Sequence, residues 1–330
     1  MSGAPSTDLH RSTQPAAEHA YRGYLYIACS TALWGTSATL GRAAFTGRLF
    51  PGSGIARIDP LILSQARTTF SCIAVLAALL LVRGPRRLLV PAADLGRLVV
   101  LGLAGVAASN YFYYLAIQRT NVATAIIIQY TAPVWVLLYM VARKLERGTL
   151  PKMVAVGLAM FGITLVIGLF GGRKLQFDSI GVGAAMVAAF SFSYYNIFAH
   201  SLLERYDRWT VLLFTTMSAA IFWLFINSPR KIAAAHYTPA AWGFLFVFAI
   251  LSVLLPFALY FAGLQHLRPT KAVVASCLEP VFSILIAAAA LHEAVSPLQA
   301  VGMAMIVGSI LVVQRPTAGD KIQAMIEPVD

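Results

Sequence analysis

One stretch of this chain occurs twice, and that repetition constrains the fold more than any other feature. Residues 260–293 form a helix end, a short polar turn and an apolar run that is interrupted by Glu279 and Pro280. The same pattern occurs 147 residues earlier without a gap. Identities at one constant offset indicate an internal repeat. They pair Tyr113 with Tyr260, Gln118 with Gln265, Ala125 with Ala272, Pro133 with Pro280 and Glu146 with Glu293.

The composition places this repeat in a membrane. Hydrophobic residues make up 59% of the 330 residues and charged residues 12%. A soluble chain of this size could not bury so much apolar surface, whereas successive apolar runs of about 20 residues match the thickness of a bilayer. The net charge of +12 comes from Lys and Arg in short loops rather than from a basic stripe. The sequence therefore predicts a polytopic membrane protein without a nucleic-acid partner.

The expected fold is an all-α membrane protein with ten transmembrane helices. Clusters of charged or helix-breaking residues, such as residues 83–87 and Ser296-Pro297, separate the apolar runs. Residues 1–23 and 316–330 are polar and are expected to be tails, and the first of them lacks the apolar core of a signal peptide. The predicted spans are 24–46, 60–82, 96–117, 121–141, 150–169, 179–199, 209–228, 240–264, 270–290 and 297–315.

The distribution of basic residues predicts the orientation. Cytoplasmic loops of membrane proteins carry an excess of Lys and Arg. With both termini in the cytoplasm, sixteen basic residues fall inside and seven outside, so this orientation is favoured. The inside set is Arg11, Arg22, Arg83, Arg86, Arg87, Arg97, Arg143, Lys144, Arg147, Lys152, Arg205, Arg208, Arg268, Lys271, Arg315 and Lys321, and the outside set is Arg48, Arg57, Arg119, Arg173, Lys174, Arg230 and Lys231.

The repeat and the topology together predict a transporter. Its two copies are separated by five spans, an odd number, so they face opposite ways across the membrane. A first five-helix repeat (24–169) and a second, inverted one (170–315) would pack about a pseudo-two-fold axis with a site between them. Exchange of the conformations of the two halves would open that site to one side and then to the other.

The sequence also resembles a known family. The opening residues 33–37 (Leu-Trp-Gly-Thr-Ser) with Gly41-Arg42, and the repeated pattern ending in residues 278–281 (Leu-Glu-Pro-Val), resemble EamA-type members of the drug/metabolite transporter superfamily. The likeness covers residues 24–315. It implies a ten-helix bundle in the cytoplasmic membrane that moves small organic solutes, often as an exporter of amino acids or other metabolites. The resemblance leaves the substrate open.

Glu279 is the acidic residue placed deepest in a predicted span. An ionisable group at that depth usually faces a bundle interior or a wet cavity. Desolvation makes a buried carboxylate a better proton acceptor, which suits proton-coupled transport. The alternative is a neutral Glu that is hydrogen-bonded to a neighbour and fixes a proline kink. Its repeat mate is Ala132, so no symmetry-related carboxylate exists.

Two arginines lie in the outer halves of predicted spans. Arg42 and Arg67 together would form a fork for a carboxylate or phosphate group of a substrate. Alternatively, each side chain reaches along its helix to the outer interface, as long basic side chains near helix ends do. Arg42 lies close to the end of its span, whereas Arg67 lies deeper and is open to either interpretation.

Further polar and aromatic residues are placed to line a substrate pocket. A mostly apolar pocket with a few fixed polar groups is typical of small-molecule sites. For each of these residues taken alone, packing between helices or a place at the membrane interface is the more common role. The candidates are Trp34, Ser37, Asn110, Tyr111, Tyr114, Gln129, Tyr194, Tyr195, Asn196 and Ser276.

The predicted function is that of a secondary transporter, with export favoured, that moves a small organic metabolite by alternating access. The sequence contains no GxxxxGK[ST] motif, so an ion or solute gradient would supply the energy. No cofactor or metal site is expected, because the three cysteines fall within spans and no CxxC or Cys/His spacing occurs. One alternative is an intramembrane enzyme, but no nucleophile lies close to a base in the sequence pattern. The other is a passive channel, which the inverted repeat disfavours. The oligomeric state is left open.

Overall fold

The computed structural model describes residues 14–46, 57–84, 89–169, 175–291 and 294–315, and within these ranges every regular element is a helix. The all-α prediction is confirmed for this part of the chain. The predictions for Glu293 and for residues 1–13 and 316–330 of the tails fall outside the described residues, as does the side chain of Arg42. The elements are α1 (Gln14–Thr46), α2 (Pro60–Arg83), α3 (Ala92–Val100), η2 (Leu101–Ala107), α4 (Ala108–Arg119), α5 (Val122–Gln129), α6 (Ala132–Ala142), α7 (Leu150–Ile167), α8 (Ser179–Leu203), α9 (Arg208–Ile226), α10 (Pro229–Ala234), α11 (Pro239–Ala249), η4 (Ile250–Leu254), α12 (Leu255–Leu264), α13 (Pro269–Ser276), α14 (Glu279–Leu291) and α15 (Pro297–Gln314).

Local sequence signals set the helix ends. Asp59 caps α2 by accepting from the backbone N–H groups of Leu61 and Ile62, and Asp178 caps α8 by accepting from that of Gly181. Ser296 and Gln299 form a capping box at the start of α15. Proline at the first or second position starts many of the helices, where its missing N–H costs nothing.

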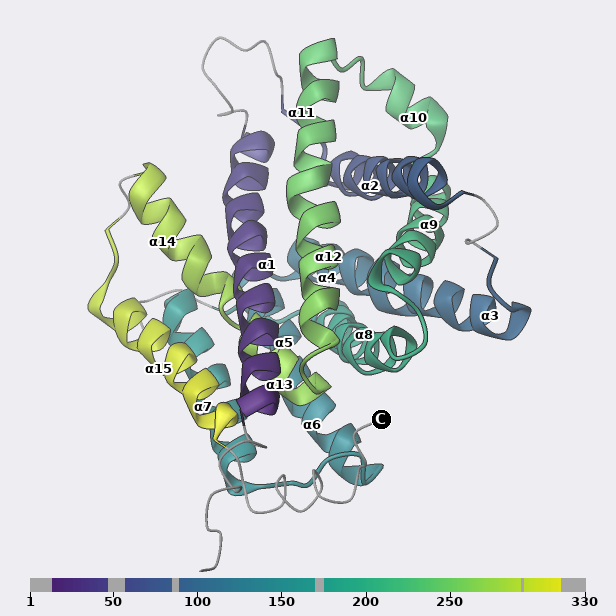
Figure 1. Cartoon of the computed structure of the whole chain (residues 1–330). Helices are drawn as coiled ribbons and strands as arrows, with labels where there is room; N and C mark the ends of the chain where they lie inside the picture. The colour runs from purple at the N-terminus through teal and green to yellow at the C-terminus, as the bar shows by residue number, and fades with distance from the viewer. Residues whose placement is uncertain (1–13, 47–56, 85–88, 170–174, 292–293, 316–330) are drawn as a thin grey trace, which may run out of the picture.

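Nine helices, or directly joined helix pairs, in the described residues are long and apolar enough to cross a membrane. They coincide with nine of the ten predicted spans. The remaining span falls within α1, which begins at Gln14 and so extends into the segment 1–23 that was expected to be a tail. The short helix α10 lies in a segment that was expected to be a loop. The start of α1 and the end of α15 lie at the same end of the bundle (Figure 1).

The spans predicted at 121–141 and 270–290 are present as Val122–Ala142 and Pro269–Ala289, and each is broken in the middle, an interruption that the sequence indicated only at Glu279-Pro280. α5 ends at Gln129 and α6 begins at Ala132, while α13 ends at Ser276 and α14 begins at Glu279. The four boundaries are related by the 147-residue offset of the repeat. Pro133 and Pro280, one residue into the second helix of each pair, have no N–H to continue the hydrogen-bond ladder.

Wide π turns also recur in the two halves. η2 and η4 interrupt the helices that precede each broken pair, and residues 103–107 of η2 correspond to η4 by the repeat offset. A π turn lengthens the hydrogen-bond ladder and leaves carbonyl groups for other donors. Ser37 Oγ donates to Leu251 O at 3.1 Å, and Asn110 Nδ2 donates to Val106 O at 2.8 Å. The π turns therefore orient side chains in the bundle interior.

Small residues let helices from opposite halves approach closely. α1 packs on α12, and α8 packs on α4. A Cβ at Gly23 would lie 2.7 Å from Leu267, and a Cβ at Gly181 would lie 2.6 Å from Thr120. Leu267 and Thr120 are related by the repeat offset of 147 residues, whereas Gly23 and Gly181 lie 158 residues apart, so the two contacts are similar but do not share one offset. α7 and α15 meet in the same way, because Gly162 and Gly302 face each other's backbone.

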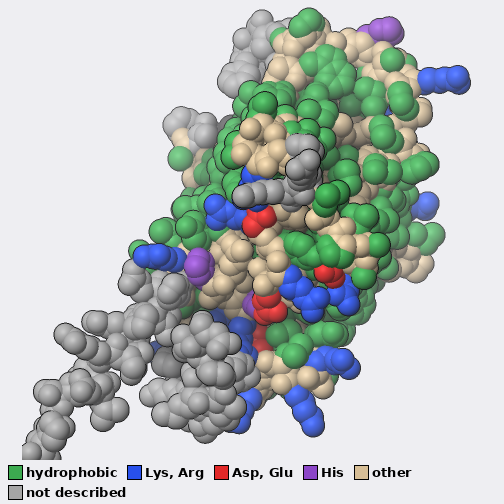
Figure 2. Space-filling model, turned by 45° about the vertical axis from the view of Figure 1, so that its right-hand side comes forward, with side chains coloured by type: hydrophobic (Ala, Val, Ile, Leu, Met, Phe, Trp, Pro, Cys, Tyr) green, Lys and Arg blue, Asp and Glu red, His purple; other side chains and the backbone are tan. Residues whose placement is uncertain are grey.

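The surface agrees with a bilayer environment. Figure 2 shows hydrophobic side chains over most of the visible face, while acidic side chains gather among Lys and Arg in its middle and lower part. Leu81, Phe225 and Leu311 are among the large apolar side chains that stay exposed. Extensive exposed apolar surface of this kind requires a lipid or protein partner.

Candidate functional site

The centre of the site lies where the two broken helix pairs meet. Glu279 is the first residue of α14, and Tyr130 lies in the break between α5 and α6. The Tyr130 hydroxyl donates to Glu279 Oε2 at 3.2 Å. The carboxylate also lies in the first turn of α14, where the helix dipole favours negative charge. Glu279 is partly exposed despite its position in the middle of a span.

A cation faces this carboxylate from another helix. Arg67 lies in α2, and its Nη2 donates to Asn110 Oδ1 at 2.6 Å. Asn110 is in turn fixed by its bond to Val106 O in the π turn. The buried Nε of Arg67 has no hydrogen-bond partner. The structure thus brings together two sequence candidates, Arg67 and Asn110, and the arginine does not reach for the interface.

Arg67 and Glu279 attract each other electrostatically but form no direct ion pair. Each charge is instead held by one neutral side chain, Asn110 on one side and Tyr130 on the other. Separated opposite charges in a low-dielectric interior are costly unless another group bridges them. The arrangement is suited to a ligand that carries both an anionic and a cationic group.

Aromatic side chains border these charges. Tyr113 and Tyr114 of α4 lie with ring centroids 6.0 Å apart, and Tyr113 interacts electrostatically with Glu279. Tyr114 was a candidate from the sequence, whereas Tyr113 and Tyr130 were not. The signal that marks Tyr113 is its identity with Tyr260 across the repeat. Tyr130 lies beside a break that the sequence interpretation treated as continuous helix, and its importance was missed for that reason.

A second group of candidates is packed rather than accessible. Tyr260 donates its hydroxyl hydrogen to Asn196 Oδ1, and Trp34 lies against the Tyr260 ring at a centroid distance of 5.3 Å. Asn196 and Ser276 are buried and also donate to backbone carbonyl groups, of Phe192 at 2.7 Å and of Val273 at 2.8 Å. This group closes the bundle on the side of α8, α12 and α13.

The remaining candidates lie apart from the charges. Ser37 is buried and bonds to carbonyl groups of Leu33 and Leu251. Tyr111 packs edge-on against Phe222 and Trp223 of α9. The last candidates are Tyr194, whose ring lies 4.3 Å from that of Phe198, the buried Tyr195, which packs on Phe257 and Phe261, and Gln129, which ends α5 and is partly exposed.

The two ends of the site differ in how tightly they are closed. α13 packs against α6 and α8, but its counterpart α5 makes at most marginal contact with the described parts of α14 and α1. In agreement, Tyr260 is fully buried while Tyr113 remains partly exposed. α13 therefore packs more closely on α6 and α8 than α5 does on α14 and α1, while α5 packs on α8, α4 and α7.

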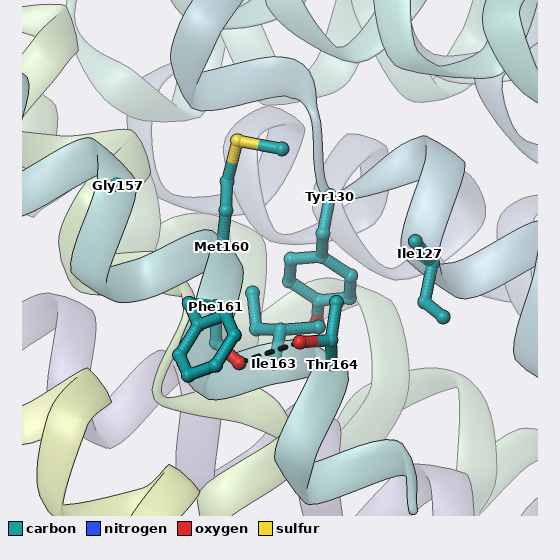
Figure 3. A pocket seen from close by; sticks show the side chains of 7 residues that line it. All are labelled: Ile127, Tyr130, Gly157, Met160, Phe161, Ile163 and Thr164. Carbon is teal, nitrogen blue, oxygen red and sulfur yellow. Dashed lines mark hydrogen bonds between the residues drawn. The ribbon is translucent and has the colours of Figure 1, made fainter. Parts of the chain in front are cut away.

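A hollow of about 270 Å³ lies beside Tyr130, which forms part of its lining. Figure 3 shows side chains of α5 and α7 around it, with the Tyr130 ring between them. Its lining consists of Ile127, Tyr130, Gly157, Met160, Phe161, Ile163 and Thr164.

These features define an integral membrane protein built from repeated, broken helices around a pair of interior charges. The pattern of the EamA-like transporter family matches residues 21–168 and again residues 179–315. The chain belongs to this family, as its resemblance in sequence predicted. The two matches fall on the two predicted halves.

Individual relatives agree with this assignment. The chain is 24% identical to an uncharacterized transporter of Archaeoglobus fulgidus over 219 residues, covering 64% of this chain and 76% of that protein. It is 20% identical to the uncharacterized inner membrane transporter YicL of Salmonella typhimurium over 294 residues, covering 88% and 95%. A protein of known crystal structure has the same fold, with a TM-score of 0.69, 20% identity and coverage of 96% of this chain and 100% of that one.

Proposed function

We propose that this protein is a secondary transporter of the cytoplasmic membrane that exports a small organic metabolite, an amino acid or a related compound, by alternating access. The observation that carries the proposal is the pair of unbridged opposite charges, Arg67 and Glu279, at the broken helices. Broken helices at mid-membrane are where transporters bind substrates, because helix ends and side chains there are free to contact a ligand.

The charges favour a zwitterionic substrate. The guanidinium of Arg67, held on one side by Asn110, offers its other donors to a carboxylate. Glu279, oriented by Tyr130, offers a carboxylate to an ammonium group. Tyr113 and Tyr114 supply aromatic surface beside them. A bound zwitterion would neutralise both charges at once, which neither a sugar nor a nucleoside does.

Glu279 also gives the transporter a means of coupling. The carboxylate that binds a substrate ammonium group binds a proton when the substrate is absent, so the two would compete for one site. Such competition exchanges one substrate for one proton across the membrane. An outward substrate movement would then be driven by inward proton movement, which agrees with export.

Alternating access follows from the repeated halves. The similar contacts of Gly23 with Leu267 and of Gly181 with Thr120 support a pseudo-two-fold axis between a first half (24–169) and an inverted second half (170–315). In this proposal, with both termini in the cytoplasm, the α5 end would face outward and the more closely packed α13 end would face the cytoplasm. Exchanging the packing of α5 with that of α13 would reverse the access.

Solute counterflow in proteoliposomes tests the function. Vesicles loaded with pooled amino acids, nucleosides or sugars are diluted into a labelled trace of the same pool. We expect transient accumulation that saturates with concentration for the amino-acid pool. Flux that rises linearly with concentration would indicate a channel, and chemical conversion of the label would indicate an enzyme. Absence of exchange for every pool in folded protein would contradict the proposal.

A further inference from the structure

The hollow beside Tyr130 offers no unsatisfied polar group. The Tyr130 hydroxyl is used by Glu279, and Thr164 Oγ1 donates to Phe161 O at 2.7 Å. The rest of the lining is apolar (Figure 3). Its volume of about 270 Å³ is near the lower end of ligand-binding pockets. An occupant that makes no hydrogen bonds fits best, which indicates a hydrocarbon chain.

An exposed apolar stripe leads to the hollow from one end of α7. Leu150 is 69% exposed, Met153 53% and Phe161 50%, and Gly157 is also exposed. Their spacing of three, four and four residues puts them on one face of the helix. From Leu150 to Gly157, the first residue of the hollow that the stripe reaches, the separation is seven residues, or roughly 10 Å along the helix. That distance lies within one leaflet, whose hydrocarbon layer is about 15 Å thick.

The same end of α7 is preceded by a basic turn. Arg143, Lys144 and Arg147 are all exposed between α6 and α7. The one carboxylate in this turn, Glu146, is buried and pairs with Lys152 at 2.9 Å, so it does not neutralise them. The three exposed cations match the negative charge of an anionic lipid headgroup, and the apolar stripe that starts beside them matches an acyl chain.

We propose that this face of α5, α7 and the turn between α6 and α7 is a binding site for an anionic phospholipid. The phosphate lies against Arg143, Lys144 and Arg147, and one acyl chain follows the stripe into the hollow and packs on the Tyr130 ring. Because Tyr130 holds Glu279, the lipid supports the geometry of the interior charge. This inference does not depend on the identity of the transported solute.

The repeat provides an internal contrast. By the 147-residue offset, Ile127 and Tyr130 correspond to Val274 and Cys277, and both of these are fully buried. Val274 packs with Ile310 in the core. The equivalent position in the second half is therefore filled by protein, and no second acyl chain is expected there.

Photolabelling in proteoliposomes tests the acyl-chain part. Phosphatidylcholine vesicles receive a trace of phosphatidylglycerol that carries a diazirine in its acyl chain, and labelled peptides are mapped. We expect label on residues 127–130 and 157–164. Gly157→Leu fills the hollow without a clash, because a Cβ there meets no heavy atom within 4 Å. This variant should lose most of that label. Gly243→Leu, at another exposed glycine with open space around its Cβ, should retain it.

A second experiment tests the contact between the lipid headgroup and the basic turn. Replacing Arg143, Lys144 and Arg147 by Gln should weaken competition by unlabelled phosphatidylglycerol by about fivefold for each charge removed. Arg230→Gln, at an exposed arginine of the short helix α10, should leave the competition unchanged. A diazirine phosphatidylcholine should label the hollow less than phosphatidylglycerol does. Equal labelling by both lipids, labelling that survives Gly157→Leu, or protection only by a transported solute would each overturn the proposal.

Discussion

The two helix breaks have the same backbone plan and different chemistry. In the first, Tyr130 and Thr131 separate α5 from α6, and Ala132 starts the second helix. In the second, Cys277 and Leu278 separate α13 from α14, and Glu279 starts the second helix. The first break thus supplies a hydroxyl donor and the second supplies the carboxylate that accepts from it.

This difference shows that the repeat sets the scaffold but not the site. The two breaks share one backbone plan, and the side chains that differ between them supply the hydroxyl and the carboxylate of the contact. The packing differs too, because Cys277 of the second break is fully buried while Tyr130 of the first is partly exposed. The proposed alternating access would need one asymmetric site and two exchangeable halves, and these differences agree with that proposal.

The largest effect is expected from Arg67→Leu. It removes the cation that would bind a substrate carboxylate and leaves Glu279 without a counter-charge. Charge-assisted hydrogen bonds contribute about 1.5–3 kcal/mol each, so exchange should fall by about a hundredfold. Initial counterflow rates in proteoliposomes measure this. Arg97→Leu, at an exposed arginine that pairs with Asp94, is the control. Unchanged transport kinetics in Arg67→Leu would show that the charge pair is not needed for transport.

Glu279→Gln makes the two breaks electrically alike, since Ala132 is also neutral. Exchange should fall at least about tenfold, because the amide cannot carry the counter-charge of an ammonium group. The residual exchange rate should also no longer depend on the pH difference between the interior and the exterior of the vesicles. Glu204→Gln, at an exposed carboxylate, should behave as wild type. Full exchange with an unaltered pH profile in Glu279→Gln would remove the proposed proton coupling.

Tyr130→Phe weakens the bond that joins the two breaks but keeps the aromatic ring. One hydrogen bond to a charged group is lost, so exchange should fall by about threefold to tenfold. The apparent KM should rise more than the maximal rate changes, since the carboxylate is less well oriented for binding. Concentration-dependent counterflow separates the two parameters. A loss as large as that of Glu279→Gln would mean that Tyr130 itself contacts the reacting or transported group.

The smallest effect is expected from Ser37→Ala, which tests whether this sequence candidate is structural. The Ser37 hydroxyl donates to Leu33 O and Leu251 O, at 2.7 and 3.1 Å. Its removal leaves a carbonyl of the π turn without that donor and should lower stability by about 1 kcal/mol. Thermal unfolding in detergent should shift by a few degrees, with exchange unchanged. Exchange lost in a variant of normal stability would place Ser37 in the pocket.

Much of the fold could be predicted because its signals are local. Apolar length and breaker clusters located the helices, and most boundaries agree with the structure within a few residues. The exact breaks and the π turns were not predicted, because they depend on how the helices pack. The interruption at Glu279 and Pro280 was visible in the sequence, but a proline alone does not tell a kinked helix from an interrupted one.

The candidate site was predictable only in part. Depth in a span singled out Arg67 and Glu279, since charges are rare there. The partners Tyr130 and Tyr113 come from other parts of the bundle, and no local sequence pattern predicts a contact between distant segments. Ser37, Asn196 and Ser276 were candidates because they are polar, but in the structure they donate to carbonyl groups within the packed interior. Polarity in a span predicts a hydrogen bond more often than a ligand.

Counterflow with one amino acid and its two single-charge analogues is the most direct test of the charge-pair account. The amide lacks the carboxylate that Arg67 would bind, and the deaminated acid lacks the ammonium group that Glu279 would bind. The account predicts saturable exchange of the zwitterion, poor exchange of both analogues, and loss of the zwitterion's advantage in Arg67→Leu and in Glu279→Gln. Equal exchange of all three compounds, unaffected by either substitution, would contradict it.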